Sequence, residues 1–487
     1  MSTPDPRRWK ALAVSLAAGF MTLLDVSIVN VALPSMQQSL HASAGTIQWI
    51  VSGYALTFGL TLVAGGRLGD VLGRRRMFLI ALSAFVLTSA LAGAAPGETP
   101  LVVARLLQGV AAGLLTPQNS GLIQDMFRGA ERGRAFGMFG ATVGISTATG
   151  PVLGGAILSL FGDESGWRWV FYVNIPVGVL AFVLAWIWVP KAQRTRTRIR
   201  DEVDYRGALL LGFAVLCVLF PLVWSEGASA GWLWLLLAAA PGFGYAFVRW
   251  ERRVTRRGGQ PLLELSLFTE VSGYYSGLVL GTVYFCGFTG VFLVMSLFLQ
   301  KGLGYTPLQS GLTVTPFALG SSITAVVSGR LIPRWGRRLT VTGLILVTLG
   351  FGAVALMVTV APVHSLGWEM ALPLLVAGIG GGAVISPNTT LTLECVPSRM
   401  AGVAGGALQT GQRIGTAVGT AVLATAFYTA VSDTQGDYPA AVSITMLFAI
   451  GFVLVAVALA VRELAVRRGL RLRGIHRHHV IATDIQR

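Results

Sequence analysis

Residues 24–34 read LDVSIVNVALP and place a carboxylate, Asp25, inside an apolar segment that runs from Trp9 to Leu33. A charged Asp at the centre of a membrane helix costs about 2.5–3.5 kcal/mol on insertion scales, so such a residue usually has a task. The apolar run is longer than that of a cleaved signal peptide, and no small-residue cleavage site closes it, which predicts an uncleaved anchor. We therefore expect this stretch to belong to the first membrane-spanning helix.

The composition predicts an all-α polytopic membrane protein. Hydrophobic residues make up 54% of the 487 positions, charged residues only 12%, and the mean hydropathy is +0.69. A soluble protein of this length needs much more surface charge, and repeated apolar runs of about twenty residues are typical of membrane-spanning helices. Fourteen spans are predicted, at residues 10–33, 46–65, 77–95, 101–124, 136–161, 169–189, 206–225, 231–249, 273–299, 309–331, 339–361, 369–393, 401–430 and 440–461.

The distribution of Lys and Arg favours fourteen spans with both termini in the cytoplasm. In that arrangement 33 of the 37 basic residues fall in cytoplasmic loops, tails or helix ends, whereas Arg168 and Lys301 lie outside and Arg105 and Arg413 lie within spans. This asymmetry agrees with the positive-inside rule. The net charge of +16 and the pI of 10.6 are therefore interpreted as topology and contact with anionic lipid head groups, and not as nucleic-acid binding. The predicted location is the cytoplasmic membrane.

The loops carry no pattern of catalysis or metal binding. Cys217, Cys286 and Cys395 are isolated, and the tail run 476–479 (HRHH) is interpreted as a solvated basic tail rather than a metal site. No phosphate-binding loop, catalytic triad or zinc-ligand spacing occurs. We therefore expect a protein that is not an enzyme and that uses no cofactor or metal.

An internal repeat divides the chain. Residues 66–75 (GRLGDVLGRR) align with residues 329–338 (GRLIPRWGRR), 263 positions later, so spans 1–6 match spans 9–14 and spans 7 and 8 are inserted between them. Two parallel six-helix halves around a central cavity are typical of transporters, with the substrate near the membrane midplane. The expected units are an N-terminal six-helix bundle, a linker with two extra helices, a C-terminal six-helix bundle and a basic cytoplasmic tail, at residues 1–189, 190–272, 273–461 and 462–487.

Several segments carry a family resemblance. Residues 66–75 resemble the loop 2–3 signature of the major facilitator superfamily, and residues 101–113 resemble its fourth-helix signature. Residues 144–155 (GISTATGPVLGG) are similar to the fifth-helix signature of exporters that work as antiporters. Residues 24–34 and 167–176 (WRWVFYVNIP) are similar to the fourteen-span drug:proton antiporter group.

The resemblance implies the major facilitator fold, two six-helix bundles plus two inserted helices, and proton-driven export of drug-like or amphiphilic compounds. The chain departs from the signatures at three positions. Val71 stands where loop 2–3 usually has a basic residue, Ser27 stands where the group commonly has Thr, and Pro333 occupies the position that Asp70 has in the first half. We therefore expect the loop 2–3 signature to form a charge-based contact that holds the gate closed in the N-terminal half only.

The fifth-helix signature combines closely spaced glycines with a proline. Small residues let another helix approach closely, and a proline removes a backbone hydrogen bond and bends the helix. Ordinary small-residue packing is the alternative interpretation. The pattern GPxxGG in the fifth span favours an antiporter hinge made of Gly144, Gly150, Pro151, Gly154 and Gly155.

The loop 2–3 signature predicts a cytoplasmic gate. The arginines alone would serve as topogenic charges, but Asp70 at the inner end of span 2 is able to pair with a basic group or with the positive N-terminus of a neighbouring helix. The resemblance implies a latch that holds the outward-facing state closed on the cytoplasmic side. The predicted gate residues are Gly66, Asp70, Gly73, Arg74 and Arg75.

Asp25 is the one acidic residue placed well inside a predicted span. At about 1.5 Å per residue it lies roughly 22 Å from Lys10, and Arg105 lies about 8 Å from Pro100 near the outer side, so the two depths allow a pair. Burial favours a protonated carboxyl group and a neighbouring arginine favours the ionised one. Asp25, Arg105 and Arg413 are therefore the predicted proton-coupling residues, and a static ion pair that fixes helix packing is the alternative.

Polar and aromatic residues of the cavity-lining spans are candidates for contact with a bulky, partly apolar substrate. Because the cavity has few acids, monovalent or neutral amphiphiles are expected rather than dications. The leading hypothesis is a monomeric proton-coupled antiporter whose partners are its substrate, protons and membrane lipids. A dedicated exporter of one endogenous metabolite, antibiotic or lipid and a membrane sensor or scaffold are the alternatives. The predicted substrate-binding residues are Asn30, Trp49, Tyr54, Gln108, Asn119, Tyr284, Phe288, Asn388, Gln409 and Gln412.

Overall fold

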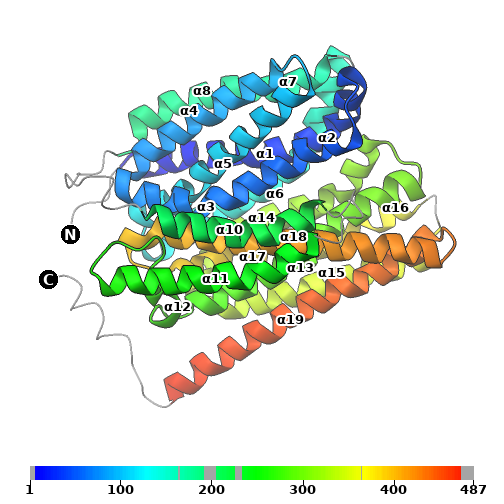
Figure 1. The fold of residues 1–487 in the computed structure, drawn as a ribbon. Coiled ribbons are helices and arrows are strands. Elements are labelled where there is room, and N and C mark those ends of the chain that lie inside the picture. The colour runs from blue at the N-terminus through cyan, green and yellow to red at the C-terminus, as the bar shows by residue number, and fades with distance from the viewer. Residues whose placement is uncertain (1–5, 163–164, 191–203, 225–232, 363–364, 473–487) are drawn as a thin grey trace.

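The structure, a computed structural model, describes residues 6–162, 165–190, 204–224, 233–362 and 365–472. Within these residues the chain forms helices and no strand, as its composition predicts. The elements, drawn in Figure 1, are α1 (Arg8–Leu40), α2 (Ala44–Gln48), the π-helical turn η1 (Trp49–Gly53), α3 (Tyr54–Leu72), α4 (Arg74–Gly93), α5 (Glu98–Met126), α6 (Gly129–Phe161), α7 (Gly166–Tyr172), α8 (Asn174–Trp188), α10 (Tyr205–Trp224), α11 (Leu233–Arg256), α12 (Ser266–Thr269), α13 (Tyr274–Leu297), the π-helical turn η2 (Phe298–Gly302), α14 (Pro307–Trp335), α15 (Arg337–Val360), α16 (Leu366–Glu369), α17 (Ala371–Leu393), the 3₁₀ turn η3 (Ser398–Met400), α18 (Ala401–Asp433) and α19 (Tyr438–Leu472).

Thirteen helices in the described part of the chain are long and apolar enough to cross a membrane, which confirms a multi-pass membrane protein. The inserted spans, α10 and α11, are among them. The predicted fifth span corresponds to α6, of which Val152–Phe161 counts as a shorter apolar helix. The structure does not describe three side chains in this helix, those of Thr147, Ala148 and Pro151. The total of fourteen spans therefore stays a prediction.

Several helices are longer than the apolar runs that predicted them. Helix α1 continues through Pro34 to Leu40, and α19 continues to Leu472. Hydropathy marks only the part of a helix suited to the hydrocarbon, whereas backbone hydrogen bonding carries the helix on into polar turns. The sixth span is instead interrupted at Val173, because Pro176 has no N–H to donate to the carbonyl group four residues earlier.

The internal repeat produces the same turn in both halves. Helix α3 turns into α4 at Gly73, with φ of 88°, and α14 turns into α15 at Gly336, with φ of 51°. Positive φ values favour glycine, which has no Cβ. We call the end of the bundle that holds these two turns the basic end, because the arginine runs Arg74–Arg76 and Arg337–Arg338 follow them.

Figure 1 shows α1 to α8 in the upper part of the view and α13 to α19 in the lower part, with α10 and α11 in green beside them. The two groups meet where α6 packs along α14 and α3 packs along α18, and α10 contacts both α3 and α18. An apolar cluster joins the groups near the basic end, and it includes Phe127, Phe136, Leu267, Met400 and Val403.

At the basic end the two groups of helices touch through their backbones. A Cβ atom on Gly133 of α6 would lie 2.7 Å from the carbonyl oxygen of Gly329 in α14, and a Cβ atom on Gly66 of α3 would collide with the backbone of Gly402 in α18. Helices approach this closely only where small residues meet. The basic end is therefore closed.

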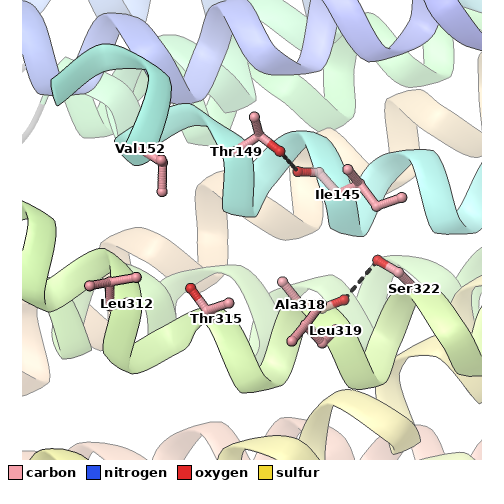
Figure 2. A pocket seen from close by; sticks show the side chains of 8 residues that line it. All are labelled: Ile145, Thr149, Val152, Leu312, Thr315, Ala318, Leu319 and Ser322. Atoms are coloured by element: carbon pink, nitrogen blue, oxygen red, sulfur yellow. Dashed lines mark hydrogen bonds between the residues drawn. The ribbon is translucent and has the colours of Figure 1, made fainter. Parts of the chain in front are cut away.

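Away from the basic end, α6 and α14 separate. A crevice of about 280 Å³ opens between them, and Figure 2 shows its lining residues on the two facing helices. The lining is mainly apolar and consists of Ile145, Thr149, Val152, Leu312, Thr315, Ala318, Leu319 and Ser322.

Candidate functional site

Asp25 of α1 is fully buried and forms an ion pair with Arg105 of α5, whose Nη1 lies 2.6 Å from the Asp25 Oδ2 atom. The other carboxylate oxygen, Oδ1, accepts hydrogen bonds from Gln108 Nε2 at 3.0 Å and from Asn174 Nδ2 at 2.9 Å. A buried charge pair is tolerated when further hydrogen bonds satisfy its remaining atoms. These four residues from α1, α5 and α8 form what we call the Asp25 cluster.

The π-helical turn η1 positions Arg105. Its Nε donates to the carbonyl oxygen of Ile50 at 3.0 Å, and its Nη1 also donates to Gln108 Oε1 at 2.8 Å. The guanidinium group lies over the ring of Tyr54, 4.1 Å from the centroid, and 5.7 Å from that of Phe171. A π-helical turn changes the local hydrogen-bonding register of a helix and is frequent at functional sites.

Arg413, the third predicted proton-coupling residue, does not join the Asp25 cluster. Its guanidinium group lies over the ring of Phe58, 4.4 Å from the centroid, so α18 reaches across to α3. The rings of Phe58 and Tyr54 are 5.9 Å apart, and Tyr54 in turn lies under Arg105. The two arginines are thus connected through an aromatic pair, at the point where the halves meet.

The predicted hinge glycines of α6 face two different neighbours. Gly144 approaches α14, where an added Cβ atom would lie 2.5 Å from Ser322 Oγ. Gly150 and Gly154 approach α1, close to Ser27 and Ile28. Gly155 has no such neighbour within 4 Å, and the side chain of Pro151 lies outside the described part.

The hydroxyl group of Ser27 links α1 to α6. It donates to the carbonyl oxygens of Leu24, 3.1 Å away in its own helix, and of Ser146, 3.2 Å away in α6. Ser27 is two residues from Asp25, so the glycine-rich face of α6 packs against the same stretch of α1 that carries the buried carboxylate. A movement of α6 therefore acts directly on the Asp25 segment.

We expect Gly150→Ala to reduce transport strongly and Gly155→Ala to leave it near the wild-type rate. The new methyl group at position 150 would meet the Cβ of Ser27 at 2.6 Å, whereas position 155 is open. Overpacking of this kind costs about 1–3 kcal/mol and displaces the helices. Uptake rates in vesicles with matched protein amounts test the prediction, and equal rates for the two variants would contradict it.

Asp70 joins the two halves at the basic end. Its carboxylate oxygens accept hydrogen bonds from the backbone N–H groups of Gly402 and Val403, both at 3.1 Å, in the first turn of α18. An acidic group at this position caps the helix and interacts favourably with its dipole. Asp70 also forms a 2.6 Å ion pair with Arg74 of α4. Asp70 therefore contacts a basic group and a helix N-terminus, the two kinds of partner predicted from the sequence.

Arg74 and Arg75 have different surroundings. Arg74 is buried, pairs with Asp125 at 2.6 Å and donates to the carbonyl oxygen of Ser398 at 3.0 Å, which lies in the other half. Arg75 donates to the carbonyl oxygen of Trp186 and lies over its ring, within its own half. Of the charged gate residues, Asp70 and Arg74 thus contact the other half and Arg75 does not.

The repeat-related turn in the second half makes a different set of contacts. Arg337, buried at the start of α15, lies 2.9 Å from Glu463 of α19 and donates to Asn388 at 2.6 Å. Asn388 in turn donates to the carbonyl oxygen of Gly277 at 2.9 Å. The predicted substrate residue Asn388 is therefore part of a buried polar cluster near the basic end.

The other predicted substrate residues are dispersed. Tyr54 and Gln108 belong to the surroundings of Arg105. Asn119 is buried and accepts a hydrogen bond from Ser15 at 2.7 Å, and Gln409 donates across the halves to Ser120 at 3.3 Å. Tyr284 and Phe288 stack with their centroids 5.2 Å apart in an aromatic cluster of the second half. Asn30 is exposed, Trp49 packs on Phe220, and Gln412 lies near Gly281.

The sequence did not identify Asn174 and Ser89 as residues of the site. Asn174 lies in the 167–176 segment, which the resemblance singled out without giving any residue a role, and it bonds both Asp25 and Ser89. Ser89 lies in an apolar run of α4 with no distinguishing pattern. The described residues contain no cluster of three or more His, Cys, Asp or Glu side chains that would hold a metal ion.

Comparison with known proteins agrees with this architecture. The family model described as Major Facilitator Superfamily matches residues 15–420 and 277–476. The chain is 38% identical to the probable actinorhodin transporter of Streptomyces coelicolor, over 87% of this chain and 73% of that protein. It is 32% identical to the tetracenomycin C resistance and export protein of Streptomyces glaucescens, over 88% of this chain and 78% of that protein.

The fold also has a solved counterpart. The crystal structure of the human organic anion transporter MFSD10 superposes with a TM-score of 0.69, at 14% identity, over 94% of this chain and 100% of that chain. The family match, the relatives and the shared fold lead to one conclusion: the chain belongs to the major facilitator superfamily of membrane transporters.

Proposed function

We propose that the protein is a proton-coupled antiporter that exports amphiphilic compounds by alternating access. The observation that carries this proposal is the buried Asp25–Arg105 pair in a transporter fold whose halves are closed at one end. A carboxylate held this far from water binds and releases a proton only when its surroundings change. Linking that change to the opening of the other end yields exchange of protons for substrate.

The names of the relatives support export. One is named a probable actinorhodin transporter and another a tetracenomycin C resistance and export protein. Two relatives named after different antibiotics support a substrate from the class of secondary metabolites or drugs. Names tied to single compounds also favour the narrower alternative, a dedicated exporter of one endogenous metabolite, antibiotic or lipid.

We further propose that the basic end faces the cytoplasm and that the protein acts as a monomer in the cytoplasmic membrane. The positive-inside rule supports this orientation, because the arginine runs after Gly73 and Gly336 lie at that end. In this orientation the closed end faces the cytoplasm. The contacts of Asp70 with the first turn of α18 would then hold the cytoplasmic side closed in the outward-facing state.

The charges near the contact between the halves favour neutral or anionic amphiphiles. Asp25 is neutralised by Arg105, and Arg413 packs on Phe58 and takes part in none of the ion pairs found in the described residues. One positive charge is thus left over in this region. A dication would meet repulsion there, because charges interact strongly in a low-dielectric interior.

Reconstituted vesicles test the proposal. An acid-inside gradient drives proton efflux through an antiporter, and a pH-sensitive dye in the lumen reports alkalinisation when substrate is added outside. A panel of ethidium, a neutral steroid and an anionic anthraquinone probes charge preference and breadth. Alkalinisation with several compounds supports multidrug export, and alkalinisation with one compound supports a dedicated exporter. Transport without any proton flux would rule out coupling, and a complete lack of transport would favour a sensor or scaffold.

A further inference from the structure

Asn174 lies where the sixth span changes from α7 to α8. Val173 interrupts the helix, and Asn174 is the first residue of α8. The interruption arises because Pro176 cannot donate a backbone hydrogen bond to Tyr172, four residues earlier. A span with one hydrogen bond missing bends more easily at that point than a continuous helix.

The side-chain amide of Asn174 bridges two helices. Its Nδ2 donates to Asp25 Oδ1 at 2.9 Å and to Ser89 Oγ at 3.0 Å. The Ser89 hydroxyl group donates to the carbonyl oxygen of Phe171 at 3.0 Å, in the turn that precedes the interruption. Both side chains are almost completely buried, so water does not replace these bonds.

The polar atoms that contact Asp25 are all donors. Arg105 Nη1, Gln108 Nε2 and Asn174 Nδ2 each donate to the carboxylate. This arrangement fits the ionised form, which is an acceptor only. A protonated Asp25 carries an O–H group that needs an acceptor, and the present arrangement supplies none within the cluster.

Asn174 is the partner best able to supply that acceptor. The amide oxygen of Gln108 already accepts from Arg105 Nη1, and Arg105 has no acceptor atom. A rotation of the Asn174 amide by half a turn would present its Oδ1 to the Asp25 O–H group. The same rotation turns Oδ1 toward Ser89, whose hydroxyl group would then donate to Asn174 instead of to Phe171.

We propose that Asn174 and Ser89 are positioning residues that transmit the protonation state of Asp25 to the interruption between α7 and α8. With Asp25 ionised, the amide donates to the carboxylate and Ser89 holds the Phe171 carbonyl group. With Asp25 protonated, the amide rotates and Ser89 releases Phe171. Proton binding then loosens the sixth span at Val173, where bending is easiest.

This proposal rests on the proposed role of Asp25 as the proton-binding group. The other charged or titratable groups near the carboxylate are Arg105 of α5 and Tyr54 of α3, with Arg413 of α18 beyond Tyr54. They come from helices other than α7 and α8. Because Arg105 also lies over the Phe171 ring, 5.7 Å from its centroid, the relay is identified by a response of the Phe171 turn that depends on Ser89.

The first experiment measures proton binding without transport. The carbonyl stretch of protonated Asp25, identified by its loss in Asp25→Asn, is titrated by infrared difference spectroscopy on the full-length protein in lipid nanodiscs. Asn174→Leu removes the acceptor that the rotated amide offers to the protonated form, so we expect the carbonyl stretch of Asp25 to move to a higher wavenumber, as in a carboxyl group with fewer hydrogen bonds. Asn174→Ala serves as a second variant if the leucine variant does not fold. An unchanged stretch frequency in the folded variant would overturn the proposal.

The second experiment follows the relay by hydrogen exchange of residues 170–176, with Asp25→Asn as the neutral mimic. In the wild-type background we expect this substitution to speed exchange several-fold. In Ser89→Ala exchange should already be fast, and Asp25→Asn should add nothing. Thr88→Ala is the matched control, because Thr88 is also buried but donates only to Ala84 and Phe85 within α4.

Two results of the exchange experiment would overturn the relay. One is wild-type exchange in Ser89→Ala, and the other is a full response to Asp25→Asn in that variant. Neither readout depends on a substrate. A lack of proton-coupled transport in vesicles would instead refute the proposed function. Failure of the relay and failure of the proposed function are therefore distinguishable.

Discussion

Asp25→Asn should abolish proton-coupled efflux while the protein still folds. The asparagine side chain has nearly the same shape and keeps an oxygen that accepts from Arg105, but it neither binds nor releases a proton. Removing the side-chain polarity altogether, as in Asp25→Leu, leaves Arg105 as a buried unpaired charge and should destabilise the protein by about 3–5 kcal/mol. Substrate-dependent alkalinisation of vesicles measures the first effect, and thermal unfolding in detergent measures the second.

The control for Asp25→Asn is Glu369→Gln, which neutralises an exposed carboxylate on the short helix α16. We expect it to transport like the wild type. Full substrate-dependent proton flux in a folded Asp25→Asn variant would exclude Asp25 as the coupling group. The static ion pair, which fixes helix packing only, would then be the better interpretation of the Asp25–Arg105 contact.

Asp70→Asn should open the basic end. The carboxylate accepts from two N–H groups in the first turn of α18 and pairs with Arg74, whereas the amide of Asp70→Asn keeps one acceptor oxygen and loses the charge that attracts Arg74 and the helix dipole. Losing the dipole interaction costs about 0.3–1 kcal/mol, and losing one of the two hydrogen bonds to a charged group costs about 1.5–3 kcal/mol. Because 1.4 kcal/mol corresponds to a factor of ten in an equilibrium constant, we expect the ratio of closed to open basic ends to fall by about tenfold or more and transport to slow accordingly.

Spin labels at Arg76→Cys and Arg338→Cys report this opening, because both positions are exposed and follow the repeated turns of the two halves. The exposed Cys395 is replaced beforehand. Arg75→Ala is the matched control, since Arg75 contacts Trp186 within its own half. An unchanged label distance distribution in Asp70→Asn would show that the carboxylate does not hold the gate.

Two contacts in the proposed mechanism were predictable from the positions of their residues along the chain. The depths of Asp25 and Arg105 along their spans indicated that they can meet, and the structure brings them into an ion pair. The position of Asp70 at a helix end indicated a helix N-terminus as partner, and α18 supplies it. Depth and chain position are counted along the helix axis, where a fixed rise per residue makes such estimates dependable.

The direction in which a side chain points around the helix was not predictable. Asn119, Asn388 and Gln108 are all polar residues within apolar spans, yet the first bonds Ser15, the second joins Arg337 and the third contacts Asp25. In a soluble helix the polar face identifies the side exposed to water. A helix in lipid is apolar all around, so its sequence gives no comparable signal.

The sequence alone determined the class of protein, the order of its spans, the repeat that relates its halves and the presence of a carboxylate in the first span. These properties follow from composition and from distances along the chain, which apolar solvent and helix geometry convert directly into structure. The tertiary structure decided which helix faces which neighbour. Only that packing places Asn174 and Ser89 beside Asp25, turns the glycines of α6 toward Ser27 and brings Asp70 to the start of α18, because each contact depends on helix rotations set by the fit of many side chains at once.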